Sequence, residues 1–261
     1  MGLLSAIALI TLLAPAIVAQ PQVQIADRLM PPSLSAPFGT DRMGSDLLSS
    51  VIWGARTTLF VAISTAAAGV LVGVPVGLIS GYYRGGLSHS MMRVSDIALA
   101  IPQILVAIAI AQTYGPSLLT LIVALSITYW PFWARLVYAE TRSIRNEVFI
   151  EAAVALGSSP GRIMVLHILP AVASSIAVRT SMGIGATIIS AATLGFLGLG
   201  APPQWPEWGR IMAESREYLP DAWWYPLAPG IAIFLTVLGF YMFADALGNV
   251  LEPRRRRARP K

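Results

Sequence analysis

Few residues in this chain have the types and spacing that enzyme chemistry needs. Its two histidines, His89 and His167, lie on different segments, and neither begins an H-E-x-x-H zinc site. Cysteine is absent, no serine lies in a G-x-S-x-G turn, and the only lysine is Lys261, so a Gly-Lys phosphate loop is excluded. We therefore expect no catalytic residue, no metal site and no cofactor on this chain. If ATP drives the protein, the nucleotide site lies on another chain.

A polar insert at residues 140–170 carries the strongest local pattern, because helix stop and start signals stand side by side in it. Gly157 can adopt the left-handed conformation that ends a helix, and Ser158 or Ser159 can cap the next helix. Pro160 suits a first helical position, and we expect the second helix to stop at Pro170. The insert thus predicts two short helices in water, joined by a sharp turn. A membrane protein rarely keeps such an element ordered unless a partner docks there.

Arg179 is the charge that we expect deepest in the bilayer, about two and a half helical turns beyond Pro170. A charge at the bilayer centre costs about 2.5–3.5 kcal/mol, so its side chain should face protein or water rather than lipid. Our hypothesis is that Arg179 lines a translocation cavity, with a structural pair or snorkelling as the alternatives. Asp96 lies one turn from Arg93, and we expect these two to pair.

Composition excludes an ordinary soluble domain. Hydrophobic residues make up 56% of the 261 residues and charged residues only 12%, with a mean hydropathy of +0.68. Soluble domains carry about 25% charged residues. The apolar residues gather into runs whose lengths are close to the ~20 residues that a helix needs to cross a bilayer. Six spans are predicted, at about 3–19, 58–81, 94–113, 117–138, 171–200 and 225–247.

The expected spans differ in detail. The first resembles a signal peptide at Ala14-Pro15-Ala16, but no basic residue precedes it, which favours a retained helix. In the second, Gly69, Gly73 and Gly77 are spaced by four and should form one face for close helix packing. The fifth is too long for one straight span, so one of its ends should bend or lie in water.

Basic residues predict the orientation. With both termini in the cytoplasm, twelve of the eighteen lysine and arginine residues fall on the inner side and five on the outer side, as the positive-inside rule requires. Half of the inner residues belong to the tail, residues 254–261, which we interpret as headgroup-binding rather than nucleic-acid-binding. Tryptophans near the expected span ends predict an aromatic belt, comprising Trp130, Trp133, Trp205, Trp208, Trp223 and Trp224.

The insert resembles the EAA loop of ABC importer permeases, in which E-A-A is followed by a glycine and, here, by H-I-L-P. Four further blocks, at residues 37–59, 92–110, 194–209 and 244–254, are similar in the same order to dipeptide, oligopeptide and nickel permeases. The resemblance covers about residues 37–254, and it is to the subunit type conventionally called C.

The resemblance implies an all-α polytopic protein with six transmembrane helices, a type I ABC importer permease fold and a cytoplasmic coupling helix. We expect a first helix and extracytoplasmic segment at 1–57, a permease core at 58–254 with the EAA insert at 140–170, and a basic cytoplasmic tail at 255–261. Residues implied to couple to the ATPase are Glu151, Ala152, Ala153, Gly157, Pro160, His167 and Pro170.

The resemblance also implies the partners and the task. They are a second, different permease subunit, two ATPase subunits beneath them, an extracytoplasmic substrate-binding protein and the lipid bilayer of the cell membrane. The expected function is uptake of dipeptides or oligopeptides, with nickel chelates or glutathione as alternative substrates. An ATP-independent secondary transporter and a polytopic membrane enzyme are the competing classes. The first would show inverted repeats and the second clustered polar groups, neither of which we find.

Overall fold

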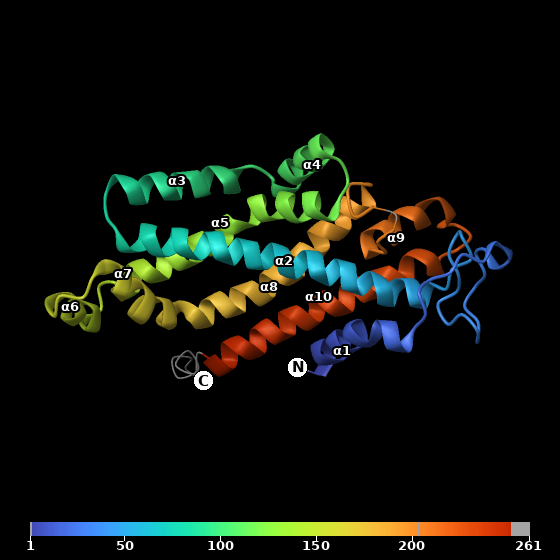
Figure 1. Cartoon of the computed structure of the whole chain (residues 1–261), viewed down its shortest axis with the longest axis horizontal. Coiled ribbons are helices and arrows are strands. Elements are labelled where there is room, and N and C mark those ends of the chain that lie inside the picture. Colours follow the sequence, from blue (N-terminus) through green and yellow to red (C-terminus); the bar gives the residue numbers. More distant parts are fainter. Residues whose placement is uncertain (1, 203, 252–261) are drawn as a thin grey trace, which may run out of the picture.

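The computed structural model describes residues 2–202 and 204–251. The secondary-structure elements in this part of the chain are all helices. Long helices lie side by side, with short helices and coil at both ends of the molecule (Figure 1). The long helices are α1 Gly2–Ile17, α2 Leu47–Tyr82, α3 Gly86–Ala100, α4 Gln103–Tyr114, α5 Leu118–Ile144, α8 Leu169–Phe196 and α10 Trp224–Leu251. The short ones are η1 Ile25–Asp27, α6 Val148–Ala155, α7 Pro160–Ile163, the π-helical η2 Met164–Ile168, α9 Trp208–Ser215 and η3 Arg216–Tyr218.

Two of the long helices begin at polar caps. Asp46 accepts a hydrogen bond of 2.8 Å from the backbone N–H of Ser49, and Ser117 accepts one of 3.0 Å from that of Thr120. The first cap starts α2 at Leu47, well before the expected residue 58, so the boundary proposed at residue 57 falls inside this helix. The predicted basic tail, residues 255–261, lies outside the described residues.

Four helices in the described part are long and apolar enough to cross a membrane: α2, α5, the continuous stretch Pro160–Phe196 and α10. A fifth crossing is possible only if α3 and α4 count as one span, and these two helices meet at an angle of 84°. The third span predicted at 94–113 therefore falls on two helices that are bent against each other, and it is not one straight helix. Ile101 precedes Pro102 and takes an extended conformation, because the proline ring disfavours helical geometry in the residue before it. The remaining predicted span corresponds to α1, an apolar helix of 16 residues that is shorter than the ~20 residues of a usual crossing.

The glycine face predicted on α2 is confirmed as a packing face. A Cβ atom added at Gly73 would lie 2.5 Å from the carbonyl oxygen of Trp130, and one at Gly77 would lie 2.7 Å from that of Ala134. The missing side chains thus allow the backbones of α2 and α5 to approach closely. This contact fixes the two helices as one rigid pair.

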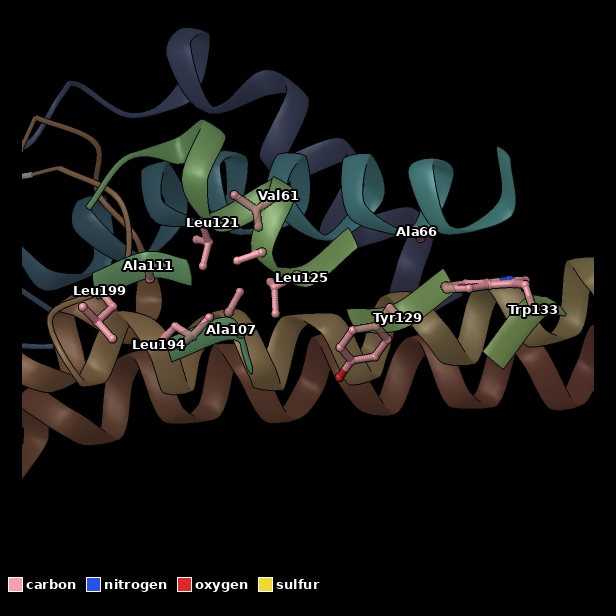
Figure 2. Close-up of a cluster of buried hydrophobic side chains, with 12 residues drawn as sticks. Val61, Ala66, Ala107, Ala111, Leu121, Leu125, Tyr129, Trp133, Leu194 and Leu199 are labelled. Atoms are coloured by element: carbon pink, nitrogen blue, oxygen red, sulfur yellow. The ribbon is translucent and has the colours of Figure 1, made fainter. Parts of the chain in front are cut away.

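Trp133 extends the same contact to α8. Its indole lies between Gly69 of α2 and Gly183 of α8, and its Nε1–H donates a 3.1 Å hydrogen bond to Thr180. Figure 2 shows Trp133 at one end of the apolar cluster that joins α2, α4, α5 and α8. The belt prediction is therefore wrong for Trp133, and also for Trp208, since both are buried. Helix packing overrides the general preference of indole for the membrane interface.

Asp96 of α3 pairs with Arg135 of α5, with 2.5 Å between the carboxylate and the guanidinium, and not with Arg93 as expected. The partner comes from a neighbouring helix that the sequence alone does not identify. Both side chains are about two-fifths exposed, so the pair contributes at most about 1 kcal/mol.

The helix stop predicted at Pro170 is also wrong. The chain stays helical from Pro160 to Phe196, passing through the π-helical turn η2. The backbone N–H of Leu169 bonds to the carbonyl of Met164, five residues back. The next residue, Pro170, has no N–H to donate to the helix. The π turn accommodates Pro170 without breaking the helix. The helix of the fifth span is therefore long because one of its ends includes residues 160–170 of the insert.

Candidate functional site

The predicted turn of the insert is present between α6 and α7. Gly157 has φ = 79°, and its N–H bonds to the carbonyl of Val154 at 2.9 Å. The N–H of Ser158 bonds to the carbonyl of Ala153 at 3.0 Å, which completes the glycine-ended helix terminus that the sequence indicates. The left-handed conformation predicted for Gly157 is thus confirmed.

The second helix of the insert begins as predicted. Ser159 occupies the cap position, although its side chain makes no capping hydrogen bond, and Pro160 occupies the first helical position. The N–H of Ile163 bonds to the carbonyl of Ser159 at 3.0 Å. From here the helix continues into η2 and α8, so the turn at Gly157 is joined directly to a membrane span.

The three residues of the E-A-A motif face different surroundings. Glu151 and Ala152 are exposed, whereas Ala153 is only 7% exposed and belongs to an apolar cluster. Ala153 packs inward because it lies on the same face of α6 as Ile150, whereas Ala152 remains at the surface. The other members of this cluster are Val74, Leu78, Val137, Ile163, Ile168 and Val172.

This cluster anchors the insert to the helix bundle. Its members come from α2, α5, α6, α7, η2 and α8, so α6 and α7 rest on the ends of three long helices. In Figure 1, α6 and α7 form one extremity of the molecule. The outer surface of the insert remains apolar, since Val148, Val154 and Leu156 are 78%, 53% and 87% exposed. An exposed apolar surface on an ordered element is typical of a docking site.

His167 and Pro170 lie on the path from the insert into α8. His167 is half-buried in η2, and Pro170 is exposed at the first turn of α8. Neither is part of a group that could hold a metal, and among the described residues no cluster of three or more histidine, aspartate or glutamate side chains forms such a site.

Arg179 is remote from the insert, nine residues along α8 and so about 14 Å beyond Pro170. It is partly exposed, and its guanidinium lies over the ring of Phe132, 4.9 Å from the centroid. Within the described residues no carboxylate forms an ion pair with it. Nearby, the hydroxyls of Tyr129 and Ser190 share a 2.6 Å hydrogen bond. Arg179 of α8 therefore contacts α5 through the ring of Phe132.

Sequence reasoning missed Glu207, whose side chain is fully buried at the opposite end of the molecule from the insert. Its Oε2 accepts a 3.0 Å hydrogen bond from the N–H of Ala201, and it lies close to the Cα atoms of Gly195 and Gly200. Burial raises the pKa of Glu207 to about 7, against the opposing effects of that hydrogen bond and of Arg210. The signal that could have found it is an acidic residue just after the glycine run 195–200.

The glycine run 195–200 forms an ordered turn after α8. Gly198 has φ = 79°, and the N–H of Leu199 bonds to the carbonyl of Leu194 at 2.9 Å. Both leucines are buried in the apolar cluster of Figure 2. The turn and Glu207 together fix where α9 lies against α8.

An ion-pair network also lies at this end. Oε1 of Glu214 accepts from Arg210 at 3.0 Å and lies 3.3 Å from Nη2 of Arg42. Arg210 belongs to α9, and Arg42 belongs to the coil that precedes α2. The network joins two segments far apart in sequence and borders a cavity of about 950 Å³.

Comparison with known proteins gives consistent similarities. Residues 73–257 match the family described as binding-protein-dependent transport system inner membrane component. The chain is 42% identical over 229 residues to a dipeptide transport system permease protein of Alkalihalophilus pseudofirmus, an alignment that covers 88% of this chain and 75% of that one. It is 40% identical to a glutathione transport system permease protein of Pectobacterium atrosepticum, over 85% and 74% of the two chains.

Among solved structures, a chain of the MetNI methionine ABC transporter in an inward-facing conformation is similar, with a TM-score of 0.63. That alignment covers 77% of this chain and 97% of the other at 20% identity. At this identity the likeness concerns the fold, and the expected type I ABC permease fold is confirmed for the aligned part.

Proposed function

Since this chain belongs to the family of binding-protein-dependent transport system inner membrane components, we propose that it is one permease subunit of an ATP-driven peptide importer. It is a multi-pass membrane protein. The observation that carries the proposal is the insert itself, an ordered turn between two helices, apolar on its outer surface and rooted in α2, α5 and α8. In the proposal a second permease subunit completes the pathway, and two ATPase subunits hydrolyse ATP.

Coupling follows from the way the insert is attached. A force on α6 and α7 enters α8 directly, because α7, η2 and α8 form one continuous helical stretch. Ile163 and Ile168 belong to the same buried cluster as Val74 and Val137, so the force also reaches α2 and α5. A close-packed core transmits such a displacement with little compression. The helices would then move as a body when the ATPase pair closes.

Within this proposal, Glu151 and Ala152 contact the ATPase, while Gly157 and Pro160 set the geometry of the turn. His167 and Pro170 lie on the connection to α8, and the insert and both termini are cytoplasmic. The described end of α10 lies toward the same end of the molecule as α6 and α7 (Figure 1), which supports a cytoplasmic carboxyl terminus.

Peptide is the proposed substrate because the relatives named as dipeptide permeases align over most of this chain. An extracytoplasmic substrate-binding protein would deliver it. Glutathione is a specific alternative, since a glutathione permease is similar to nearly the same degree and glutathione is itself a tripeptide. The two alternatives share a scaffold and differ in the ligand that the receptor retains.

Co-purification and uptake test the proposal. A tagged chain should bring down a second permease subunit and an ATPase, and the reconstituted complex with its receptor should accumulate labelled dipeptide only when ATP is present inside. A complex that contains no ATPase, or that takes up peptide equally without ATP, would indicate a secondary transporter. Competition by unlabelled glutathione separates the two substrate classes.

A further inference from the structure

A large cavity lies at the end of the molecule opposite to the insert. Its volume is about 950 Å³, within the range of about 300–1,000 Å³ that is usual for ligand sites. Its walls come from residues 20–21, the coil 41–45, the start of α2, residue 118, and the segment 204–214 with Tyr225. Figure 1 shows these coils and α9 gathered at that end.

This cavity lies outside the hydrocarbon core if α2 crosses the membrane as expected. The 36 residues of α2 extend about 54 Å, whereas the hydrocarbon is about 30 Å thick. The surplus falls at the start of α2, where Ser50, Trp53, Arg56 and Thr57 line the cavity. On the orientation proposed above, the cavity faces the extracytoplasmic side.

Arg56 is the cation of the cavity that lacks a carboxylate partner in the described part of the chain. Its guanidinium lies 5.3 Å from the centroid of the Trp53 ring, and the side chain is exposed. Trp53 is itself fixed, because its Nε1–H lies 3.2 Å from the carbonyl oxygens of both Val18 and Ala19. A guanidinium stacked in this way keeps its N–H edge available for a planar, two-oxygen acceptor.

The rest of the lining holds paired charges and apolar contact. Arg42 and Arg210 share the carboxylate of Glu214, and the carboxyl groups of Asp41 and Glu207 also line the cavity, so Arg56 remains as its unpaired cation among the described residues. Phe60 and Trp205 provide apolar surface beside them. Guanidinium groups next to aromatic rings favour a ligand that carries a carboxylate and an organic side chain.

We propose that this outer cavity binds the free terminal carboxylate of a short peptide, with Arg56 on its Trp53 platform as the main contact. The inference rests on the proposed function and adds a recognition site on the permease to that of the receptor. Asp41 lines the same cavity, and its Oδ1 accepts hydrogen bonds from the N–H groups of Met43 and Ser45, so the cavity also holds a fixed carboxylate suited to an ammonium group.

The test compares uptake of one tripeptide with a free carboxylate and the same tripeptide as its C-terminal amide. The reconstituted importer and its receptor are used throughout, so the preference of the receptor is common to all variants. Arg56→Gln should lower the acid-to-amide ratio of uptake rates by about tenfold, as expected for loss of a charge-assisted contact. Arg56→Lys should give an intermediate ratio. Arg216→Gln is the matched control, since Arg216 is also exposed but stacks on Phe196 outside the cavity.

Three results would overturn the inference. The first is an unchanged ratio in Arg56→Gln with normal uptake, and the second is an equal fall in Arg216→Gln. The third is weaker docking of the empty receptor to Arg56→Gln, which would make the cavity a protein-docking surface instead. Absence of ATP-driven peptide uptake by the unaltered importer is a different result, because it removes the proposed function as well.

Discussion

The indole of Trp133 occupies the space in which a side chain at Gly69 would lie. Trp133 is on α5 and Gly69 is on α2. Gly183 of α8 packs against the same ring, because a Cβ atom added at Gly183 would lie only 2.7 Å from Cζ2 of Trp133. One tryptophan therefore sets the separation of three helices. The insert is anchored to the same three helices. Packing at Trp133 therefore holds together the group of helices that a movement of the insert would displace.

Gly69→Val should destabilise the folded protein by about 1–3 kcal/mol or more, because the added methyl groups must displace a buried indole. The measurement is the apparent melting temperature of the purified chain in detergent. Gly230→Val is the matched control, since Gly230 is also on a membrane helix and has no atom within 4 Å of an added Cβ. Equal melting temperatures for the two variants would contradict this account of Trp133.

Gly157→Val should uncouple ATP hydrolysis from uptake while the protein still inserts, because a β-branched residue cannot take φ = 79° without strain. Gly157→Asn should retain most of the coupling, since asparagine tolerates that conformation. Glu151→Lys should also uncouple, through a reversed charge on the exposed face of α6.

The measurement for these variants is the ratio of transported peptide to hydrolysed ATP in proteoliposomes. Gly161→Ala is the control, because Gly161 lies in the adjacent helix α7 with open space around it. Normal ratios in both Gly157→Val and Glu151→Lys would remove the coupling role of the insert.

Arg179→Cys should react with a charged, membrane-impermeant thiol reagent in the assembled importer if Arg179 lines a water-filled pathway. The chain has no cysteine, so the new thiol gives the only signal from this subunit. Thr187→Cys is the buried control on the same helix, and Phe234→Cys, on exposed α10 surface, is the control for a lipid-facing position. Labelling of Arg179→Cys no faster than that of Phe234→Cys would place Arg179 against lipid or a partner chain.

The buried carboxyl of Glu207 predicts a pH dependence of stability. Its pKa is raised from 4.5 to about 7, so the folded protein holds more protons than the unfolded chain between these values. Stability should therefore fall as the pH rises from about 4.5 to 7, by up to about 3 kcal/mol, and stay level above that range.

Glu207→Gln should remove this dependence and raise the melting temperature at pH 8 relative to the unaltered protein. Thermal unfolding at pH 5 and pH 8 measures it, with the exposed Glu217→Gln as the control. If the melting temperature of Glu207→Gln changes between pH 5 and pH 8 as much as that of the unaltered protein, the burial of this carboxyl is not the cause of the pH dependence.

Much of the protein follows from its sequence, because the signals concerned act over a few residues. Apolar runs of sufficient length predicted the helical membrane class and most of the spans. The glycine at 157 followed by Ser158, Ser159 and Pro160 predicted the turn of the insert, since backbone conformation is set locally. The spacing of Gly69, Gly73 and Gly77 predicted a close helix contact, because a period of four places them on one face.

Other features depend on which helices become neighbours, and no local pattern contains that information. The partner of Asp96 is Arg135 and not Arg93, Trp133 is buried and not interfacial, and Ala153 faces inward. Pro170 does not end its helix because a π turn accommodates it, and Glu207 is enclosed by a turn and a helix that meet only after folding. The sequence by itself determined the class, most of the spans and the turn at Gly157. Burial and pairing were decided by the tertiary structure, because they arise from contacts between residues distant along the chain.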